Sequence, residues 1–213
     1  MRALILALAA LALPLVLGGC DNTVYSRLPL VGQRHEGGDP EFRPGLYLIS
    51  GFEDRCQFDI RKKLSLWPDC AVGAEFKRGE MWLVSNHQRV LAQTQRFISG
   101  EPVIVQSHWS TDVLRDSRAP EPKNAENPFF GWTYTAVTPT KTDPAGRIME
   151  AKLTPALCGP PAAGKASTDQ PFAGLTPSGT NCIAKDFDTV RNALAQSVGI
   201  GQSRTIRWVR DNP

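Results

Sequence analysis

The chain has 213 residues, with 24 Lys and Arg, 21 Asp and Glu, and five cysteines. This length suits one domain with a sizeable core behind a short leader. The net charge of +3 is too small to indicate nucleic-acid binding, so we expect no nucleic-acid partner.

The first 19 residues have the three parts of an export signal. Arg2 supplies a positive charge, Ala3–Leu17 form an uncharged run rich in Leu and Ala, and two glycines follow. A transmembrane helix needs about 20 apolar residues. Because this run is shorter, we interpret residues 1–19 as a signal peptide that is removed.

The signal ends in Leu17-Gly18-Gly19-Cys20, which resembles the lipobox of bacterial lipoprotein precursors. The resemblance covers only this stretch and implies a processing route rather than a fold. It implies cleavage before Cys20, a diacylated Cys20 thiol and often an acylated amino group. Asp21 resembles an inner-membrane retention signal of enteric-type lipoproteins. The alternative is an ordinary cleaved signal with an incidental cysteine.

The resemblance therefore implies a location in the bacterial cell envelope, with the protein anchored in the bilayer through Cys20 and facing the periplasm. Residues 20–43 are expected to hold the lipidated cysteine and a flexible tether, because Asp21–Arg43 is rich in Pro and Gly with little apolar period. Such a tether would hold the domain a few tens of Å from the lipid. A single mostly β domain is predicted over residues 44–213.

If Cys20 is lipidated, an even number of cysteines remains, which in an oxidising compartment predicts two disulfides. Three pairings are possible, and we favour the one that joins cysteines adjacent in sequence, Cys56–Cys70 and Cys158–Cys182. The rival interpretation is a zinc site. The cysteine spacings contain no C-x-x-C pair, so we expect no metal and no cofactor.

Short apolar or alternating runs predict strands at 45–50, 89–97, 103–109, 131–137, 147–153 and 205–210, and residues 76–84 predict two strands around a Gly-containing turn. The turn Asp143-Pro144-Ala145-Gly146 makes the hairpin around it the clearest one. Residues 159–181, rich in Gly and Pro, are expected to form a long structureless loop that the second disulfide closes.

One helix is predicted near the C-terminus, with Asp186 as its N-cap and Gly199 at its end. Its apolar residues fall at helical spacing: Phe187, Val190, Leu194 and Val198. The predicted fold class is therefore mainly β, an antiparallel barrel or sandwich of roughly seven to nine strands with one C-terminal helix.

The sequence lacks the usual catalytic motifs, including G-x-S-x-G, H-E-x-x-H, the P-loop and the G-x-G-x-x-G fingerprint. The three histidines, His35, His87 and His108, form no recognisable dyad. Scattered acids could converge in space to cleave glycans, although ordinary surface acids are the simpler interpretation: Glu53, Asp54, Glu101, Asp112 and Glu150.

Among the five tryptophans, Trp82 and Trp132 are expected in the core. Trp67, next to Pro68 in a loop, is expected to be exposed and is the candidate contact for a partner. The sequence thus favours a lipid-anchored, non-enzymatic envelope protein that binds a protein or cell-wall partner. An envelope hydrolase and a small-ligand-binding barrel are the alternatives.

Overall fold

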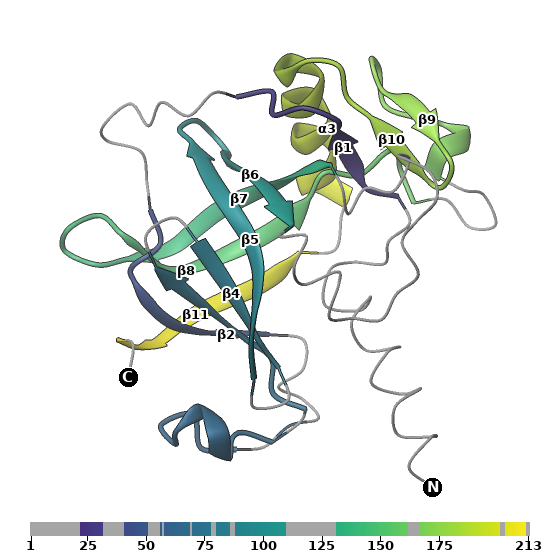
Figure 1. The fold of residues 1–213 in the computed structure, drawn as a ribbon. Coiled ribbons are helices and arrows are strands. Elements are labelled where there is room, and N and C mark those ends of the chain that lie inside the picture. Colours follow the sequence, from purple (N-terminus) through teal and green to yellow (C-terminus); the bar gives the residue numbers. More distant parts are fainter. Residues whose placement is uncertain are drawn as a thin grey trace, which may run out of the picture.

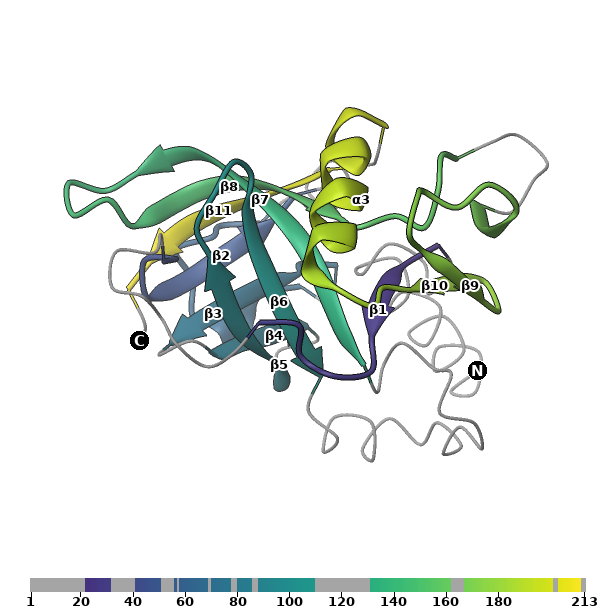
Figure 2. The same cartoon turned by 90° about the horizontal axis from the view of Figure 1, so that it is seen from above.

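The structure is a computed structural model that describes residues 22–31, 41–50, 56, 58–68, 70–77, 80–85, 88–109, 131–161, 167–200 and 203–211. The predicted signal peptide, Cys20 and Asp21 lie outside these residues. Figure 1 shows the chain coloured along the sequence, and Figure 2 shows it from above.

Eight strands of the described chain pair in a closed ring, in the order β6-β5-β4-β3-β2-β11-β8-β7, and β7 pairs back onto β6. Every pairing in the ring is antiparallel. The mainly β fold with one C-terminal helix is confirmed, and the ring is a barrel. Its strands are β2 (Gly45–Ile49), β3 (Gly73–Lys77), β4 (Glu80–Ser85), β5 (Gln88–Ile98), β6 (Val103–Trp109), β7 (Trp132–Thr142), β8 (Ile148–Pro155) and β11 (Arg204–Arg210).

The barrel interior is filled with apolar side chains, as is usual for eight strands. Alternate residues of the strands point inward, such as Tyr47 and Ile49 on β2 and Ala74 and Phe76 on β3. Phe42 enters from the segment before β2 and stacks on Phe76, with the ring centroids 4.2 Å apart. The centre of the barrel is therefore a packed core.

The predicted hairpin is β7 and β8, joined by the turn at 143–146. Gly146 has φ +79°, the left-handed conformation that the turn was expected to need. The Asp143 carboxylate accepts hydrogen bonds from the amides of Ala145 and Arg147, each at 2.9 Å. These hydrogen bonds stabilise the turn, and the turn sets the register between β7 and β8.

Helix α3 (Phe187–Ile200) lies outside the barrel beside β7 (Figure 2). The predicted N-cap is confirmed, because Asp186 Oδ1 accepts from the Thr189 amide at 2.8 Å. Val190 and Leu194 are fully buried in one apolar cluster with Tyr134 and Ala136 on the outer face of β7. Val198, the last of the four apolar residues at helical spacing, is 43% exposed and so lies outside the core, and the helix runs past Gly199 to Ile200.

Three short strands extend the sheet beyond β7: β1 (Val24–Ser26), β10 (Asn181–Ile183) and β9 (Thr176–Ser178). The 3-10 turn η4 (Ser167–Asp169) precedes β9 and β10 in the chain. The prediction of a structureless loop over 159–181 was therefore wrong in part. β9 and β10 have three residues each, too few to show an alternation of apolar and polar residues.

Trp82 and Trp132 were both expected in the core, and neither is fully buried. Trp132 is half-buried and packs at the edge of the cluster under α3, whereas Trp82 is half-buried outside the three main apolar clusters of the described residues. The 3-10 turn η2 (Leu64–Leu66) and the chain around it cover the outer faces of β2 and β4.

Candidate functional site

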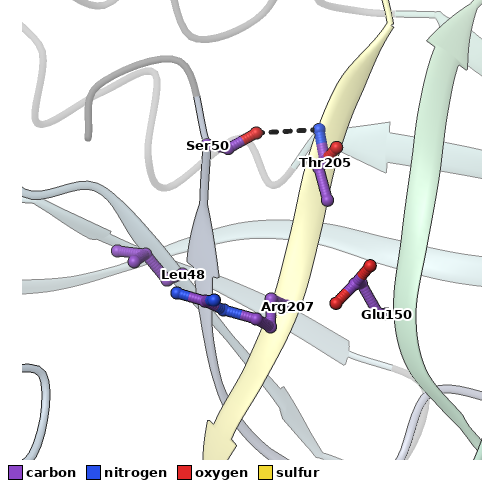
Figure 3. Close-up of a pocket in the computed structure, with 5 residues that line it drawn as sticks. All are labelled: Leu48, Ser50, Glu150, Thr205 and Arg207. Atoms are coloured by element: carbon purple, nitrogen blue, oxygen red, sulfur yellow. Dashed lines mark hydrogen bonds between the residues drawn. The ribbon is translucent and has the colours of Figure 1, made fainter. Parts of the chain in front are cut away.

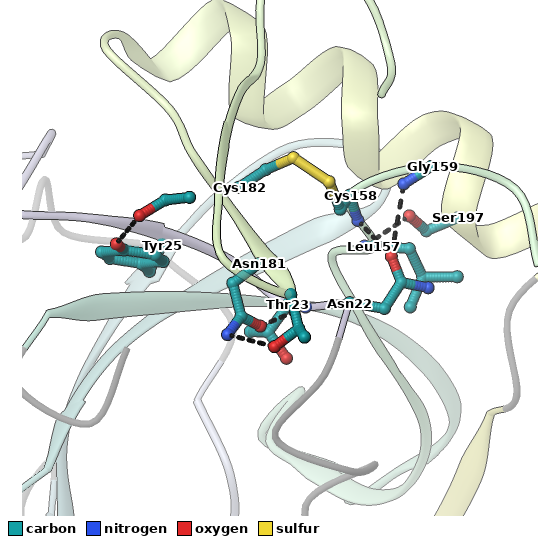
Figure 4. The surroundings of a disulfide bond; sticks show 11 residues. Asn22, Thr23, Tyr25, Leu157, Cys158, Gly159, Asn181, Cys182 and Ser197 are labelled. Carbon is teal, nitrogen blue, oxygen red and sulfur yellow. Dashed lines mark hydrogen bonds between the residues drawn. A yellow bond between two sulfur atoms is a disulfide. The ribbon is translucent and has the colours of Figure 1, made fainter. Parts of the chain in front are cut away.

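The N-terminal end of the described chain is fastened to the domain from its first residue. Asn22 donates its amide to the Thr180 carbonyl at 2.7 Å, and its side-chain Oδ1 accepts from the amides of Cys158 and Gly159 at 2.9 and 3.3 Å. Its φ of 73° lies in the left-handed region, which Asn tolerates better than most residues. Figure 4 shows this arrangement beside a disulfide.

That disulfide, Cys158–Cys182, joins the chain after β8 to β10, with the two Cα atoms 5.3 Å apart. Strand β1 lies between the two segments that the disulfide joins, which are the chain after β8 and strand β10. The amide of Cys158 donates to the Asn22 carbonyl and the amide of Cys182 donates to the Thr23 carbonyl, both at 3.0 Å. We call residues 22–26 and this disulfide the N-terminal clamp.

After the clamp, the chain at Leu30 and Val31 is held by the buried side chain of Gln106. Gln106 on β6 is fully buried, and its Oε1 accepts from the amides of Leu30 and Val31 at 2.9 and 3.1 Å. Tyr134 lies beside it and hydrogen-bonds Ser26 Oγ at 2.6 Å. Burial raises the pKa of Tyr134 to about 12, so its hydroxyl keeps its proton.

These contacts correct the predicted tether over residues 20–43. Val24 and Tyr25 are 0% and 1% exposed, and Phe42 lies in the barrel core, so the described parts of that range belong to the domain. The pattern was missed because β1 is three residues long and its partners lie more than a hundred residues away. Residues 32–40 lie outside the described chain.

The two predicted disulfides are present as paired in the sequence analysis. Cys56 and Cys70 are joined with their Cα atoms 5.6 Å apart, and Cys158 is joined to Cys182. The zinc interpretation is thereby excluded for these four cysteines, because a disulfide sulfur is no thiolate ligand.

The predicted exposed contact at Trp67 was wrong. Its side chain is 2% exposed and packs with Phe58, with ring centroids 5.1 Å apart, while its Nε1 donates to the Lys62 carbonyl at 3.1 Å. Gly73 explains the fit, because a Cβ there would lie 3.1 Å from the Trp67 ring. The loop tryptophan covers the outer face of β3 instead of facing a partner.

One shallow hollow lies on the outer face of the barrel, over β2, β11 and β8 (Figure 3). Its volume of about 270 Å³ is below the roughly 300–1,000 Å³ of typical ligand pockets. Glu150 and Arg207 are cross-strand partners there, and Ser50 Oγ accepts from the Thr205 amide at 3.1 Å. Glu150 is the one carboxylate among the residues that line this hollow, and it accepts a hydrogen bond from the Thr140 hydroxyl at 2.9 Å.

The other candidate catalytic residues are dispersed or undescribed. Glu101 is exposed before β6, and the His108 ring lies 4.9 Å from the Trp132 ring. The remaining acids and histidines fall outside the described residues: Glu53, Asp54, Asp112, His35 and His87. Among the described residues, the structure does not place two of the candidate acids in the one hollow.

Two carboxylates with lowered pKa values, Asp186 and Asp143, have structural partners. Backbone and side-chain hydrogen bonds from Thr189 hold the pKa of Asp186 below its usual value. Burial opposes ionisation of Asp143, but hydrogen bonds from the Arg147 side chain and from two turn amides outweigh it, so its pKa is also lowered. Both shifts belong to a helix cap and a turn, so neither indicates catalysis.

Comparison of the chain with known protein families, curated proteins and solved structures finds no match. In the part of the chain that the structure describes, no helix has the length and apolar character to cross a membrane.

Proposed function

We propose that this protein is a lipid-anchored component of the bacterial cell envelope, held through acylated Cys20 and facing the periplasm. The observation that carries the proposal is the Leu17–Cys20 lipobox, which resembles that of lipoprotein precursors. Asp21 favours retention in the inner membrane. Each buried methylene contributes about 0.8 kcal/mol, and stable anchoring needs more than one acyl chain, which a lipidated Cys20 would supply.

The cysteine count supports the proposal independently. Four of the five cysteines are joined in pairs, so Cys20 has no other cysteine of this chain with which to form a disulfide. Disulfides persist in oxidising compartments such as the periplasm. An acylated thiol at Cys20 accounts for the one sulfur that the two disulfides leave over.

The role of the anchored domain is proposed to be non-enzymatic binding of an envelope protein or of cell-wall material. The described barrel has a filled interior and well-fastened surface segments, which suit a rigid scaffold for contacts. Solubilised membranes from cells that make a tagged full-length protein should yield a stable partner on affinity purification. Recovery of none, with known envelope complexes intact, would contradict the binding role.

The anchor is tested with Cys20→Ser. The wild-type protein should partition into the detergent phase, and mass spectrometry of its N-terminal peptide should show a lipid-modified Cys20. The variant should move to the aqueous phase. The matched control, Cys56→Ala with Cys70→Ala, should partition like wild type. An unmodified N-terminus, or equal partitioning of the Cys20 variant, would overturn the proposal.

A further inference from the structure

We infer that the anchored domain stands on the bilayer in one orientation, with the turn between β9 and β10 against the lipid headgroups and the η2 loop pointing away. The inference rests on the proposed acylation of Cys20 and adds the surface that contacts the membrane. The inference is based on the short segment of chain between the anchor, Cys20, and the first described residue of the domain, Asn22.

The distance from the anchor to the domain is set by covalent geometry. Cys20 stands two positions before Asn22, and a chain spans at most about 3.3–3.6 Å per residue. The Cα atom of Cys20 therefore lies within about 7 Å of that of Asn22 in any conformation. A flexible tether of 23 residues would instead have a typical end-to-end distance of about 25 Å.

The attachment point is immobile on the domain side. Asn22 is held by hydrogen bonds of its amide, its carbonyl and its side chain, and the next amide, that of Thr23, donates to Asn181 Oδ1 at 2.9 Å. The following strand, β1, is buried and paired with both β7 and β10. While the N-terminal clamp is intact, the domain can therefore turn relative to the anchor only through the few backbone dihedrals between Cys20 and Asn22.

The surface next to Asn22 is suited to headgroups. Thr180, whose carbonyl accepts from Asn22, is exposed, as is Gly179 in the same turn. Residues 170–184, which contain β9, β10 and their turn, include no charged side chain. Placing this surface at the headgroup level buries no charge, so it incurs no large desolvation cost.

The opposite end of the molecule carries the strongest competing membrane contact. The run Arg61-Lys62-Lys63 is exposed, and Leu66 is 64% exposed in the same disulfide-closed loop, features that attract a domain to anionic lipid. Figure 1 shows this loop, the blue coil at the bottom, far from β1, β9 and β10. Because Cys20 lies within about 7 Å of Asn22, the surface around β9 and β10 stays next to the bilayer, and the η2 loop reaches the lipid only if the whole domain lies on its side.

The orientation is tested on the full lipidated protein in vesicles of phosphatidylethanolamine and phosphatidylglycerol. A fluorophore is attached at Thr180→Cys or, as the matched control, at Lys62→Cys, both exposed positions. A nitroxide on the lipid headgroups should quench the label at position 180 several-fold more than the label at position 62. The difference should persist at high salt, because the short tether rather than charge sets the pose.

Equal quenching at the two positions, or stronger quenching at 62, would overturn the orientation while leaving the anchor intact. A third variant with a flexible Gly/Ser insertion between Asp21 and Asn22 should stay on the vesicles and lose most of the difference. A difference unchanged by the insertion would also contradict the inference. Protein that fails to remain on vesicles, or lacks lipid by mass spectrometry, would instead overturn the proposed anchor itself.

Discussion

At the scale of single residues, Trp67 shows how a neighbour far along the sequence decides burial. Its place beside Pro68 in a loop indicated exposure, yet the outer faces of β2 and β4 present Leu46, Leu48 and Val84, which need cover. Gly73 leaves room for the indole ring. Neither feature is visible in the sequence around Trp67, because the contacts depend on strand pairing.

Trp67→Ala should destabilise the domain by about 3–5 kcal/mol, the usual loss for removing a large buried aromatic side chain. Urea unfolding measures the loss. Trp82→Ala, at a half-buried position on β4, is the control and should cost clearly less. Equal losses of stability for the two variants would show that burial of the Trp67 ring contributes no more to stability than the half-buried Trp82 ring does.

Asp143 makes a second prediction at this scale. Its folded-state pKa is lowered, so its contribution to stability is present above the ordinary carboxyl pKa of about 3.9 and is lost as the pH falls through the folded value. Melting temperature should therefore fall on acidification below about pH 4. Asp143→Asn should flatten that fall, whereas Asp188→Asn, at an exposed position, should keep the wild-type profile. Identical profiles for all three proteins would contradict this.

At the scale of elements, β1 is the least predictable part of the fold. It is three residues long, and it pairs with β10 in parallel and with β7 antiparallel. By contrast, β6, β7, β8 and β11 were predicted from runs long enough to show apolar alternation or a bounded apolar stretch. A short strand carries no such signal and depends on partners that other elements supply.

The Cys158–Cys182 disulfide should hold β1 in place. Replacing both cysteines with Ala should cost about 3 kcal/mol in the chain-entropy model and should speed hydrogen exchange at the Val24 and Tyr25 amides. The matched variant is Cys56→Ala with Cys70→Ala, which opens the other loop. It should lower stability while leaving exchange at β1 slow. Unchanged protection of β1 in the first variant would mean that the hydrogen bonds of the clamp suffice without the disulfide.

At the scale of the whole molecule, one strand pairing separates a barrel from a sandwich. The strand runs in the sequence suit either architecture, and the pairing of β6 with β7 closes the ring. Closure of the ring removes exposed sheet edges from these eight strands. The interior of an eight-stranded barrel is narrow enough for side chains alone to fill it. The N-terminal clamp and α3 lie outside that closed unit, and the clamp is on the side that we propose faces the bilayer.

The class of fold, most strands, the capped helix and the number of disulfides could be predicted from the sequence alone, because these depend on local periodicity, turn residues and cysteine count. The favoured disulfide pairing was one of three, and the structure selects it. The lipobox also rests on a local pattern, and its acylation remains a prediction. Only the tertiary structure decided that residues 22–31 belong to the domain, that Trp67 is buried and that the barrel closes. These outcomes depend on contacts between residues far apart in sequence, and no local pattern of side chains records such contacts.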